Sequence, residues 1–324
     1  MKKVKIFFVF LLAVLILQSC KDQKENPEQK VVAIINLQRH PILDAVENHT
    51  ISSLKNAGYE EGKNLTLIKK NANGQTNLIP TIANEIIAEN PDLIITISTP
   101  ITQQFIKSAK CPIVFGAVTN PAGDGIIKSL DKPEENITGT ADVLPYEEQI
   151  KLIRTIHPKA KRLGIIYNPA EGPSRFALQH IEVYAPKYGF QLVKKTVAKT
   201  LEIQNAAQTI INECDVILVS SDNTVTGGLS SIVNIAIKNK KPLYAGDEGS
   251  IQKGAIGSYS INYDMIGEET GKLAARVLAG EKNIPVFVST KGDLVINTKA
   301  AELMGVTLPD SLINIALKKY NTIQ

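Results

Sequence analysis

The sequence predicts an α/β fold that is divided into two lobes, each built on a parallel β-sheet. From Val31 onward, short apolar runs rich in β-branched residues alternate with helical stretches, which is the pattern of parallel α/β units. The chain from Val31 to Gln324 is longer than one compact core usually holds, so we expect two lobes. A repeat within the sequence divides the chain in the same way.

The two halves of this repeat share one plan. In the first half, residues 90–100 place an apolar run before Ser-Thr-Pro, and residues 111–117 follow a helical stretch. In the second half, residues 213–222 place a similar run before Ser-Ser-Asp, and residues 241–247 follow another helical stretch. Further segments follow the second half, so we expect several connections between the lobes.

The individual elements are predicted from length and periodicity. The expected strands are residues 31–35, 65–69, 93–97, 113–118, 163–167, 191–196, 216–220, 242–245 and 255–260, with a final strand at 286–296. The expected helices include residues 41–57, 78–89, 146–156, 174–188, 202–212 and 265–279.

The N-terminus has the features of an export signal. Three lysines precede an apolar run at residues 6–17, which is shorter than the roughly 20 residues that a transmembrane helix needs. Leu17-Gln18-Ser19-Cys20 looks like a bacterial lipobox, although Gln18 stands where a small residue is usual. In that pattern the chain is cut before Cys20, which is acylated and becomes a stable membrane anchor. We therefore expect a signal peptide at residues 1–19 and lipidation of Cys20.

The charge and cysteine content of the mature chain argue against a nucleic-acid-binding protein and against a disulfide-rich one. Residues 20–30 are expected to form a flexible tether, because residues 21–30 contain no large apolar side chain. Removal of the leader takes the net charge from +4 to about +1, so there is no electrostatic case for nucleic-acid binding. Only Cys111 and Cys214 then remain outside the anchor, so we expect no disulfide framework. The expected location is the cell envelope, facing the periplasm or the exterior.

Polar loops follow six of the predicted strands. Because ligands of parallel α/β sheets bind beyond the carboxyl ends of the strands, these loops predict a ligand cleft. Several place a helix-capping residue before Pro, and capping alone is the simpler explanation for any single loop. Six such loops facing one crevice favour a ligand site. The loops are residues 38–41, 98–100, 119–121, 167–169, 221–224 and 246–248.

The residue types in these loops suggest what they bind. Ser98 and Thr99 stand at a predicted helix start, where free N–H groups suit a carboxylate or another anion. Asp222, Asp247 and Glu248 supply negative charge from the other lobe, which suits a ligand ammonium. No metal or cofactor is expected, since the histidines lack metal-ligand spacing. The candidate ligand-binding residues are Arg39, His40, Ser98, Thr99, Thr119, Asn120, Tyr167, Asn168, Asp222, Asn223, Asp247 and Glu248.

A succession of motifs between about residues 31 and 317 resembles a known family, the ABC-transporter substrate-binding lipoproteins associated with tryptophan and tyrosine uptake. Their order along the chain is more specific than any one of them. The motifs are Arg39-His-Pro-Ile-Leu-Asp44, Gly58-Tyr-Glu-Glu-Gly-Lys-Asn64, Ala72-Asn-Gly-Gln75, Pro91-Asp-Leu-Ile94, Phe115-Gly-Ala-Val-Thr-Asn-Pro121, Asn136-Ile-Thr-Gly139, Tyr167-Asn168, Ser221-Asp-Asn-Thr-Val225, Ile261-Asn-Tyr263 and Leu294-Val-Ile-Asn297.

The resemblance implies a type I periplasmic-binding-protein-like fold, in which two Rossmann-like lobes are joined by a three-crossover hinge and close on a small molecule. One lobe would hold residues 31–140 and 262–288, and the other would hold residues 141–261 and 289–324. The implied ligand is an amino acid, and the better-understood members are associated with aromatic ones. The implied partners are an ABC permease and its ATPase subunits, and we expect a monomer.

Two positions depart from the family pattern. Arg39 and Asn120 stand where relatives often have an acid, which removes negative charge from the first lobe. The ligand therefore differs here, or the acids of the second lobe suffice. Four aromatic side chains could face an aromatic ligand, and ordinary packing explains each of them equally well. They are Phe105, Phe115, Tyr167 and Tyr244.

Enzyme and regulator hypotheses have weaker support. Cys111 and Cys214 suggest the paired thiols of cofactor-independent amino-acid racemases, but each precedes its strand, at the end remote from the binding loops. Residues 267–272 superficially suggest a phosphate loop, but the spacing is one residue short and Leu273 replaces the required Ser or Thr. A sugar-sensing transcription regulator would carry a DNA-binding helix pair where the export signal stands.

The sequence therefore predicts a lipid-anchored solute receptor rather than an enzyme. It would close on an amino acid or a related small molecule and hand it to a membrane permease, without cofactors. Two alternatives stay open at this point. One is an enzyme similar to the amino-acid racemases, and the other is a ligand sensor for another membrane partner.

Overall fold

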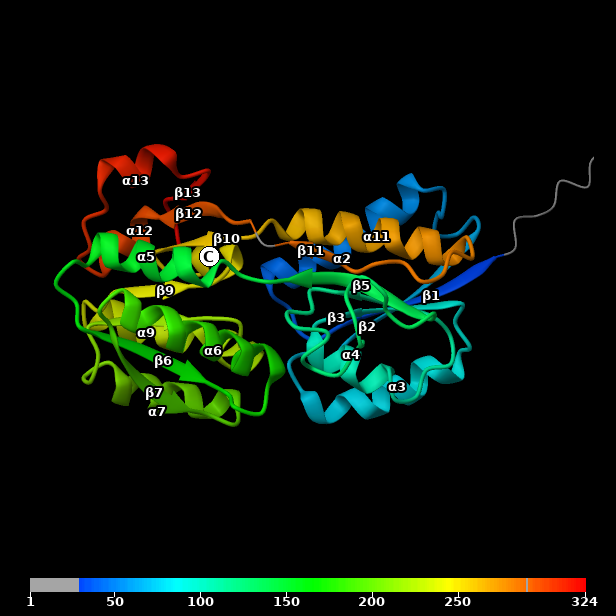
Figure 1. The fold of residues 1–324 in the computed structure, drawn as a ribbon, viewed down its shortest axis with the longest axis horizontal. Coiled ribbons are helices and arrows are strands. Elements are labelled where there is room, and N and C mark those ends of the chain that lie inside the picture. Colours follow the sequence, from blue (N-terminus) through cyan, green and yellow to red (C-terminus); the bar gives the residue numbers. More distant parts are fainter. Residues whose placement is uncertain (1–28, 290) are drawn as a thin grey trace, which may run out of the picture.

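The computed structural model describes residues 29–289 and 291–324, which fold into two lobes side by side (Figure 1). Each lobe has a β-sheet with helices packed against it. The predicted α/β fold with two parallel-sheet lobes is confirmed. The predicted signal peptide, Cys20 and most of the predicted tether lie outside the described residues.

In the described chain, the first lobe contains a six-stranded sheet in the order β11-β5-β4-β3-β1-β2, with every neighbouring pair parallel. Strand β3 is buried along its whole length, as expected for a parallel strand covered by helices on both faces. The strands are β1 (Lys30–Asn36), β2 (Leu65–Asn71), β3 (Leu93–Ile97), β4 (Ile113–Gly116), β5 (Ile137–Asp142) and β11 (Phe287–Ser289). The helices are α2 (Pro41–Asn56), η1 (Thr76–Leu78), α3 (Ile79–Ala88), α4 (Thr99–Phe105) and α11 (Tyr263–Leu278).

The second lobe contains two sheets among the described residues. Its main sheet is parallel, with the order β7-β6-β8-β9, and a smaller sheet has the order β10-β12-β13. The strands are β6 (Arg162–Tyr167), β7 (Gln191–Thr196), β8 (Val216–Val219), β9 (Leu243–Ala245), β10 (Gly257–Ser260), β12 (Asp293–Asn297) and β13 (Lys318–Tyr320). The helices are α5 (Tyr146–Ile156), α6 (Gly172–Lys187), η2 (Thr200–Glu202), α7 (Ile203–Ile210), α8 (Asn223–Gly227), α9 (Leu229–Lys238), α10 (Glu248–Gln252), α12 (Thr298–Leu303) and α13 (Asp310–Ile315).

The described chain passes between the lobes at three places (Figure 1). It leaves the first lobe after β5, which ends at Asp142, and returns between β10 and α11, which begins at Tyr263. It leaves again between β11 and β12. The ends of β5 and β11 differ by one or two residues from the predicted lobe limits at 140/141 and 288/289, and those limits stay a prediction.

Three details of the sequence prediction are wrong or incomplete. The single strand predicted at residues 286–296 is two strands, β11 and β12, which belong to the sheets of different lobes. Gly292 lies at this break, where an added Cβ would be 2.8 Å from the Pro145 ring, so the connection passes closely against the first crossover. Strands β5 and β13 were missing from the expected strands. Finally, β10 pairs with β12 in the antiparallel direction.

Two glycines allow α11 to pack closely on α2. An added Cβ at Gly267 would lie 2.7 Å from the Val46 carbonyl oxygen, and one at Gly271 would lie 2.5 Å from the Thr50 carbonyl oxygen. At this approach the Thr50 hydroxyl donates to the Gly267 carbonyl at 3.1 Å. The motif at residues 267–272 is therefore part of a helix–helix contact inside the first lobe, and the phosphate-loop interpretation is excluded.

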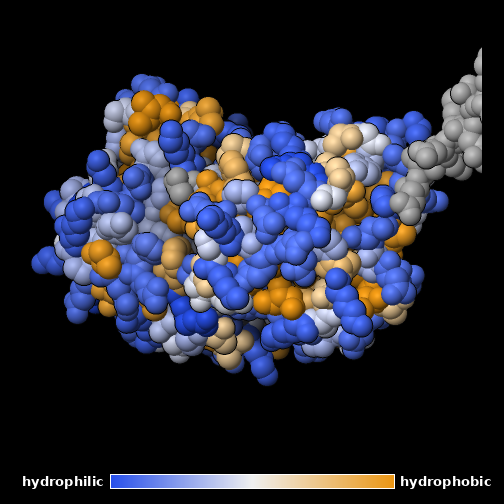
Figure 2. Space-filling view, turned by 45° about the vertical axis from the view of Figure 1, so that its right-hand side comes forward, coloured by the Kyte–Doolittle hydropathy of each residue, from blue (hydrophilic) through white to orange (hydrophobic). Residues whose placement is uncertain are grey.

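The visible surface is mostly polar. In Figure 2, apolar residues form small separate groups among charged ones, which is normal for a folded domain. Over residues 29–289 and 291–324, no helix combines the length and the apolar character needed to cross a bilayer.

Substitution of Gly271 tests the close helix contact. Gly271→Ala should lower the free energy of unfolding by about 1–3 kcal/mol, because the methyl group overlaps backbone and side-chain atoms of α2. Lys272 is the next residue of α11, and its side chain is 58% exposed. Lys272→Ala should therefore change the free energy of unfolding by no more than about 0.5 kcal/mol. Chemical denaturation measures both, and equal stability of the two variants would contradict the packing described here.

Candidate functional site

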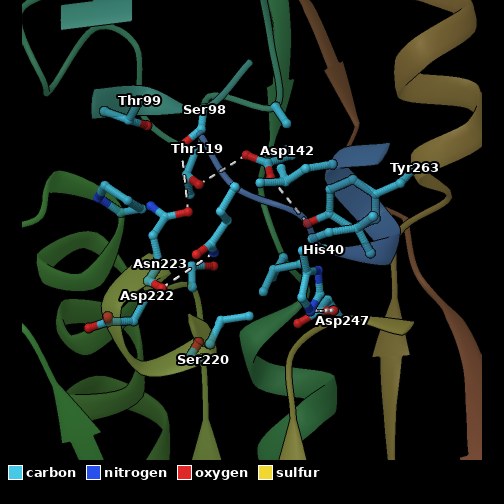
Figure 3. Close-up of a pocket in the computed structure, with 18 residues that line it drawn as sticks. His40, Ser98, Thr99, Thr119, Asp142, Ser220, Asp222, Asn223, Asp247 and Tyr263 are labelled. Carbon is cyan, nitrogen blue, oxygen red and sulfur yellow. Dashed lines mark hydrogen bonds and ion pairs between the residues drawn. The ribbon is translucent and has the colours of Figure 1, made fainter. Parts of the chain in front are cut away.

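A cavity lies between the lobes, where the carboxyl ends of both parallel sheets meet (Figure 3). Its volume is about 50 Å³, and its wall combines polar groups with several apolar side chains. Both lobes contribute to the wall. The lining residues are Gln38, His40, Ile42, Leu43, Ser98, Thr99, Ala117, Thr119, Asp142, Leu144, Pro173, Ser220, Ser221, Asp222, Asn223, Thr226, Asp247 and Tyr263.

The first lobe presents residues that directly follow its strands. Ser98 and Ala117 follow β3 and β4, and both have positive φ angles, +89° and +53°. Such angles are costly for residues other than glycine and collect at functional sites. Ser98 is also the N-cap residue of α4, so the cavity meets the start of that helix.

Asp142 is the acid that the first lobe contributes to the cavity wall, and it is buried at the end of β5. Its Oδ1 accepts a hydrogen bond from the Thr119 hydroxyl at 2.9 Å, and its Oδ2 accepts one from the Tyr263 hydroxyl at 3.1 Å (Figure 3). Because Asp142 precedes the first crossover and Tyr263 follows the second, this bond joins two hinge connections at the cavity. The cavity and the hinge therefore share the same side chains.

The second lobe contributes two acids that cap short helices. Asp222 caps α8 through the Val225 N–H at 2.9 Å, and Asp247 caps α10 through the Ser250 N–H at 2.8 Å. Asp222 also accepts hydrogen bonds from the Asn168 N–H and the Ser174 hydroxyl. Both aspartates are thus held in fixed positions by their own lobe.

Burial makes two carboxylates of this cavity, those of Asp142 and Asp222, costly to ionise. Desolvation raises the pKa of Asp142 to about 6, although the hydrogen bonds from Thr119 and Tyr263 oppose the shift. Desolvation, with a further contribution from Glu171, raises the pKa of Asp222 to about 7. A cationic group inside the cavity would favour the charged forms of both acids.

Two polar groups in the wall have no partner in the described protein. Both ring nitrogens of His40 and the hydroxyl of Ser220 are buried without a hydrogen bond, and the nearest acid, Asp247, lies 4.0 Å from the His40 ring. Burial lowers the pKa of His40, which favours the neutral ring. An unpaired buried polar group costs about 1–3 kcal/mol, so both positions favour a polar ligand that pairs with them.

The lobes touch each other beside the cavity. The Ser98 hydroxyl of the first lobe is 3.5 Å from Oδ1 of Asn223 in the second, and the Gln38 side chain is 3.4 Å from the Asn223 carbonyl oxygen. Figure 3 shows Ser98 and Asn223 facing each other across the cleft. The structure therefore represents a closed arrangement of the lobes.

Seven of the twelve candidate residues line this cavity. Six are less than a tenth exposed, and Asn223 is half-buried at the contact between the lobes. Their contact with a ligand stays a prediction. The seven are His40, Ser98, Thr99, Thr119, Asp222, Asn223 and Asp247.

Two candidates of the first lobe lie outside the cavity wall. The Arg39 side chain is 71% exposed and pairs with Asp44 at 3.2 Å, so it points to solvent. Asn120 accepts a hydrogen bond from the Gly123 N–H at 3.1 Å and shapes its own turn. The two departures from the family pattern therefore fall beside the cavity and not on its wall.

Three candidates of the second lobe also lie outside the wall. Asn168 holds wall residue Asp222 in place through its backbone N–H, and its side chain donates to the Thr224 hydroxyl at 3.0 Å. Tyr167 is half-buried against the core. Glu248 turns away from the cavity and pairs with Lys318 at 2.8 Å.

The sequence analysis missed several wall residues. Asp142 ends a strand that was not predicted, although a run of β-branched residues ending in Asp is a usable signal. Tyr263 follows a crossover, and no local pattern brings it back to the cavity. Ile42, Leu43 and Leu144 form part of the apolar wall, and in the sequence they cannot be told from core residues.

The remaining aromatic and sulfur groups lie elsewhere. Phe105, Phe115 and Tyr244 are almost completely buried in the core, so packing accounts for them. Cys111 and Cys214 precede β4 and β8, at the ends of these strands opposite to the cavity. Burial raises the pKa of the Cys214 thiol to about 11.

Comparisons with known proteins identify relatives over most of the chain. A tyrosine-binding protein of Clostridioides difficile strain R20291 is 33% identical over 276 residues, which are 84% of this chain and 80% of that protein. The solved structure of an ABC domain from Streptococcus pneumoniae in complex with L-Trp has a TM-score of 0.87 and 29% identity, covering 90% of this chain and all of that one.

A second solved structure differs from this chain in shape more than the L-Trp complex does, although its sequence identity to this chain is similar. The ligand-free, open structure of a substrate-binding protein with adhesive properties from Clostridium difficile has a TM-score of 0.67, with 30% identity over 90% of this chain and 99% of that one. This chain is thus closer in overall shape to the L-Trp complex than to the open structure, in agreement with the contacts between its lobes. The family model described as ABC transporter substrate binding protein matches residues 31–320. The chain therefore belongs to the family of ABC transporter substrate-binding proteins.

Proposed function

We propose that this protein is the lipid-anchored receptor of an ABC importer and that it closes on an amino acid in the cavity between its lobes. The observation that carries the proposal is the set of three buried aspartates, Asp142, Asp222 and Asp247, around a cavity that also meets a helix start. Such a cavity offers separate places for a positive and a negative group. An amino acid carries both.

The charges of the cavity suit the two ends of an amino acid. The ammonium group is expected near the aspartates, where it would offset their repulsion and their loss of water. The carboxylate is expected near Ser98 and Thr99, where the Thr99 and Ile101 N–H groups are not used within α4; Pro100 between them has no N–H. His40 and Ser220 then have polar partners within the closed cleft.

Two observations bear on the side chain of the ligand, and they favour different sizes. The tyrosine-binding protein of Clostridioides difficile and the L-Trp complex from Streptococcus pneumoniae, which are 33% and 29% identical to this chain, favour an aromatic amino acid. The cavity of about 50 Å³ is smaller than the roughly 150 Å³ that accommodates benzene in a protein interior. An aromatic ligand therefore requires side chains of the wall or the lobes themselves to move apart, and a small amino acid, which needs less room, is the second candidate.

Binding without catalysis agrees with the positions of the thiols. A racemase would need Cys111 and Cys214 beside the ligand, whereas both lie at the strand ends opposite to the cavity. Burial raises the pKa of both thiols, so very little of either is present at neutral pH as the thiolate that a racemase would use as its base. We therefore expect hinge closure alone, with contacts from both lobes stabilising the closed state.

The proposed setting follows from the N-terminal sequence and from the family. The basic and apolar leader and the lipobox favour export and an acyl anchor on Cys20, with the body outside the cytoplasmic membrane. The proposed partners are the permease and ATPase subunits of the importer. The protein is expected to act as a monomer.

A ligand screen tests the proposed function. L-Tyrosine and L-tryptophan at about 100 times their dissociation constants should stabilise the fold by about 2.7 kcal/mol, which raises the midpoint of thermal unfolding. Sugars and nucleosides should have no effect. A shift with glycine or L-alanine alone would select the small amino acid, and a shift with sugars or nucleosides alone would reject the proposal.

The affinity should depend on pH in a defined direction. An amino acid keeps both charges between pH 5.5 and 8, and the lowered pKa of His40 keeps its ring neutral over most of this range. Asp142 and Asp222, with pKa values of about 6 and 7, take up protons as the pH falls through this window and then no longer attract the ammonium. Affinity should therefore fall below pH 7, by up to about tenfold per pH unit for each proton released on binding.

Calorimetry in buffers with different ionisation enthalpies measures both the affinity and the number of protons released on binding. The wild type should release protons on binding below pH 7, and Asp142→Asn should release fewer. An affinity that stays constant from pH 8 to pH 5.5 would show that these aspartates do not meet a cation.

The anchor can be tested apart from binding. Cys20→Ser should prevent acylation and leave the protein outside the membrane fraction, because the lipobox thiol is the acceptor of the lipid. Metabolic labelling with a fatty acid measures this outcome. Ser19→Ala, which keeps a small residue before the cut, is the control and should be labelled normally, whereas labelling of Cys20→Ser would reject the lipoprotein assignment.

A further inference from the structure

A second contact between the lobes lies outside the cavity and joins Asp124 to the start of α6. Asp124 belongs to the first lobe, in the connection between β4 and β5, and its side chain is only 4% exposed. Gly172 is the first residue of α6 in the second lobe, and an added Cβ there would lie 2.0 Å from Oδ1 of Asp124. The carboxylate therefore occupies the space that any other side chain at Gly172 would need.

The first lobe holds Asp124 in a preformed turn. The Asp124 N–H donates to the Asn120 carbonyl at 2.9 Å, and the Asn120 side chain accepts from the Gly123 N–H at 3.1 Å. From α4, the Gln103 side chain donates to the Asp124 carbonyl oxygen at 3.1 Å. Asn120, which does not line the cavity, thus helps to place this carboxylate.

The second lobe meets the carboxylate with positive charge. The start of α6 carries the positive end of the dipole of a 16-residue helix. Arg175 lies 3.8 Å from Oδ1 of Asp124, and its guanidinium is fixed by bonds to the carbonyl oxygens of Pro169 and Ala170 at 3.0 Å. Oδ2 of Asp124 is buried without a hydrogen bond, and desolvation raises the pKa of this acid. The attraction to Arg175 opposes that shift and offsets part of the cost of burial.

The same helix start forms part of the cavity wall. Pro173 lines the cavity, and the Ser174 hydroxyl donates to Asp222 at 2.7 Å. Of three consecutive residues of α6, the first therefore contacts the opposite lobe, the second lines the cavity and the third bonds an aspartate of the wall. When Asp124 packs against Gly172, the contact also fixes the positions of the next two residues, Pro173 and Ser174.

We infer that Asp124, Gly172 and Arg175 form an inter-lobe clasp that positions α6 over the bound ligand and slows its release. The inference rests on the proposed function, since it assumes closure on an amino acid. Asp124, Gly172 and Arg175 do not line the cavity, so they are positioning residues and not ligand contacts. The clasp requires glycine at residue 172 only while the lobes are closed.

A double-mutant cycle on the full chain tests the clasp, with L-tyrosine as the first probe and L-tryptophan, then L-alanine, if the wild type does not bind it. Gly172→Ala should raise the dissociation rate at least tenfold in stopped-flow measurements, because its methyl group overlaps the Asp124 carboxylate. Asp124→Ala should raise it by a similar factor. The double variant should dissociate no faster than Asp124→Ala alone, since the methyl group then has room.

Three controls keep the result specific. Glu85→Ala removes an acid paired with Lys70 at 2.8 Å within the first lobe, and it should leave the dissociation rate unchanged. Thermal unfolding without ligand should give the same midpoint for Gly172→Ala and the wild type, because alanine is well tolerated in a helix. Arg175→Ala removes the guanidinium that attracts Asp124 and leaves the buried carboxylate without this compensation, so it should accelerate release even if Gly172→Ala fails to fold.

The outcomes separate the two proposals. Unchanged release from Asp124→Ala and Arg175→Ala, or strictly additive effects of the Asp124 and Gly172 substitutions, would reject the clasp while the amino-acid receptor stands. A wild type that binds none of the three amino acids would reject the proposed function, and the clasp with it.

Discussion

The structure depends on the burial of negative charge where the two sheets meet. Asp142, Asp222 and Asp247 lose most of their contact with water in the closed arrangement, and this desolvation raises the pKa of the first two. Hydrogen bonds within each lobe hold the carboxylates in place but do not neutralise them. A cationic ligand group would remove this penalty, so the closed state is stabilised by the same contact that recognises the ligand.

The fold explains why these groups can meet. All strands of the main sheet in each lobe run in one direction, so the polar residues that follow them collect at one edge. Two crossovers place Asp142 and Tyr263 at the junction of the lobes, where their hydrogen bond links the hinge to the cavity. Closure therefore changes the surroundings of the cavity and of the hinge together. The clasp at Asp124 adds a second contact between the lobes, and it positions the start of α6, which forms part of the cavity wall.

Much of the architecture could be predicted from the sequence, because alternating apolar runs and an internal repeat report local structure directly. The helix caps Asp222 and Asp247 were also predictable, since an acid after a strand and before a helix is a local pattern. Asp142 and Tyr263 were not, because chain crossovers bring them together from 121 positions apart. Glu248 shows the opposite error: it stands next to Asp247 in the sequence, but its side chain leaves the cavity for Lys318.

The central claim is that buried carboxylates recognise the ammonium group of an amino acid, and the most direct measurement compares a ligand with its analogue that lacks the amine. Calorimetry at pH 8 with L-tyrosine and 3-(4-hydroxyphenyl)propanoate, and with L-alanine and propanoate, keeps the rest of each ligand constant. We expect the amino acid to bind at least about tenfold more tightly, which corresponds to one charge-assisted hydrogen bond or more. Equal affinity within a pair would contradict the account.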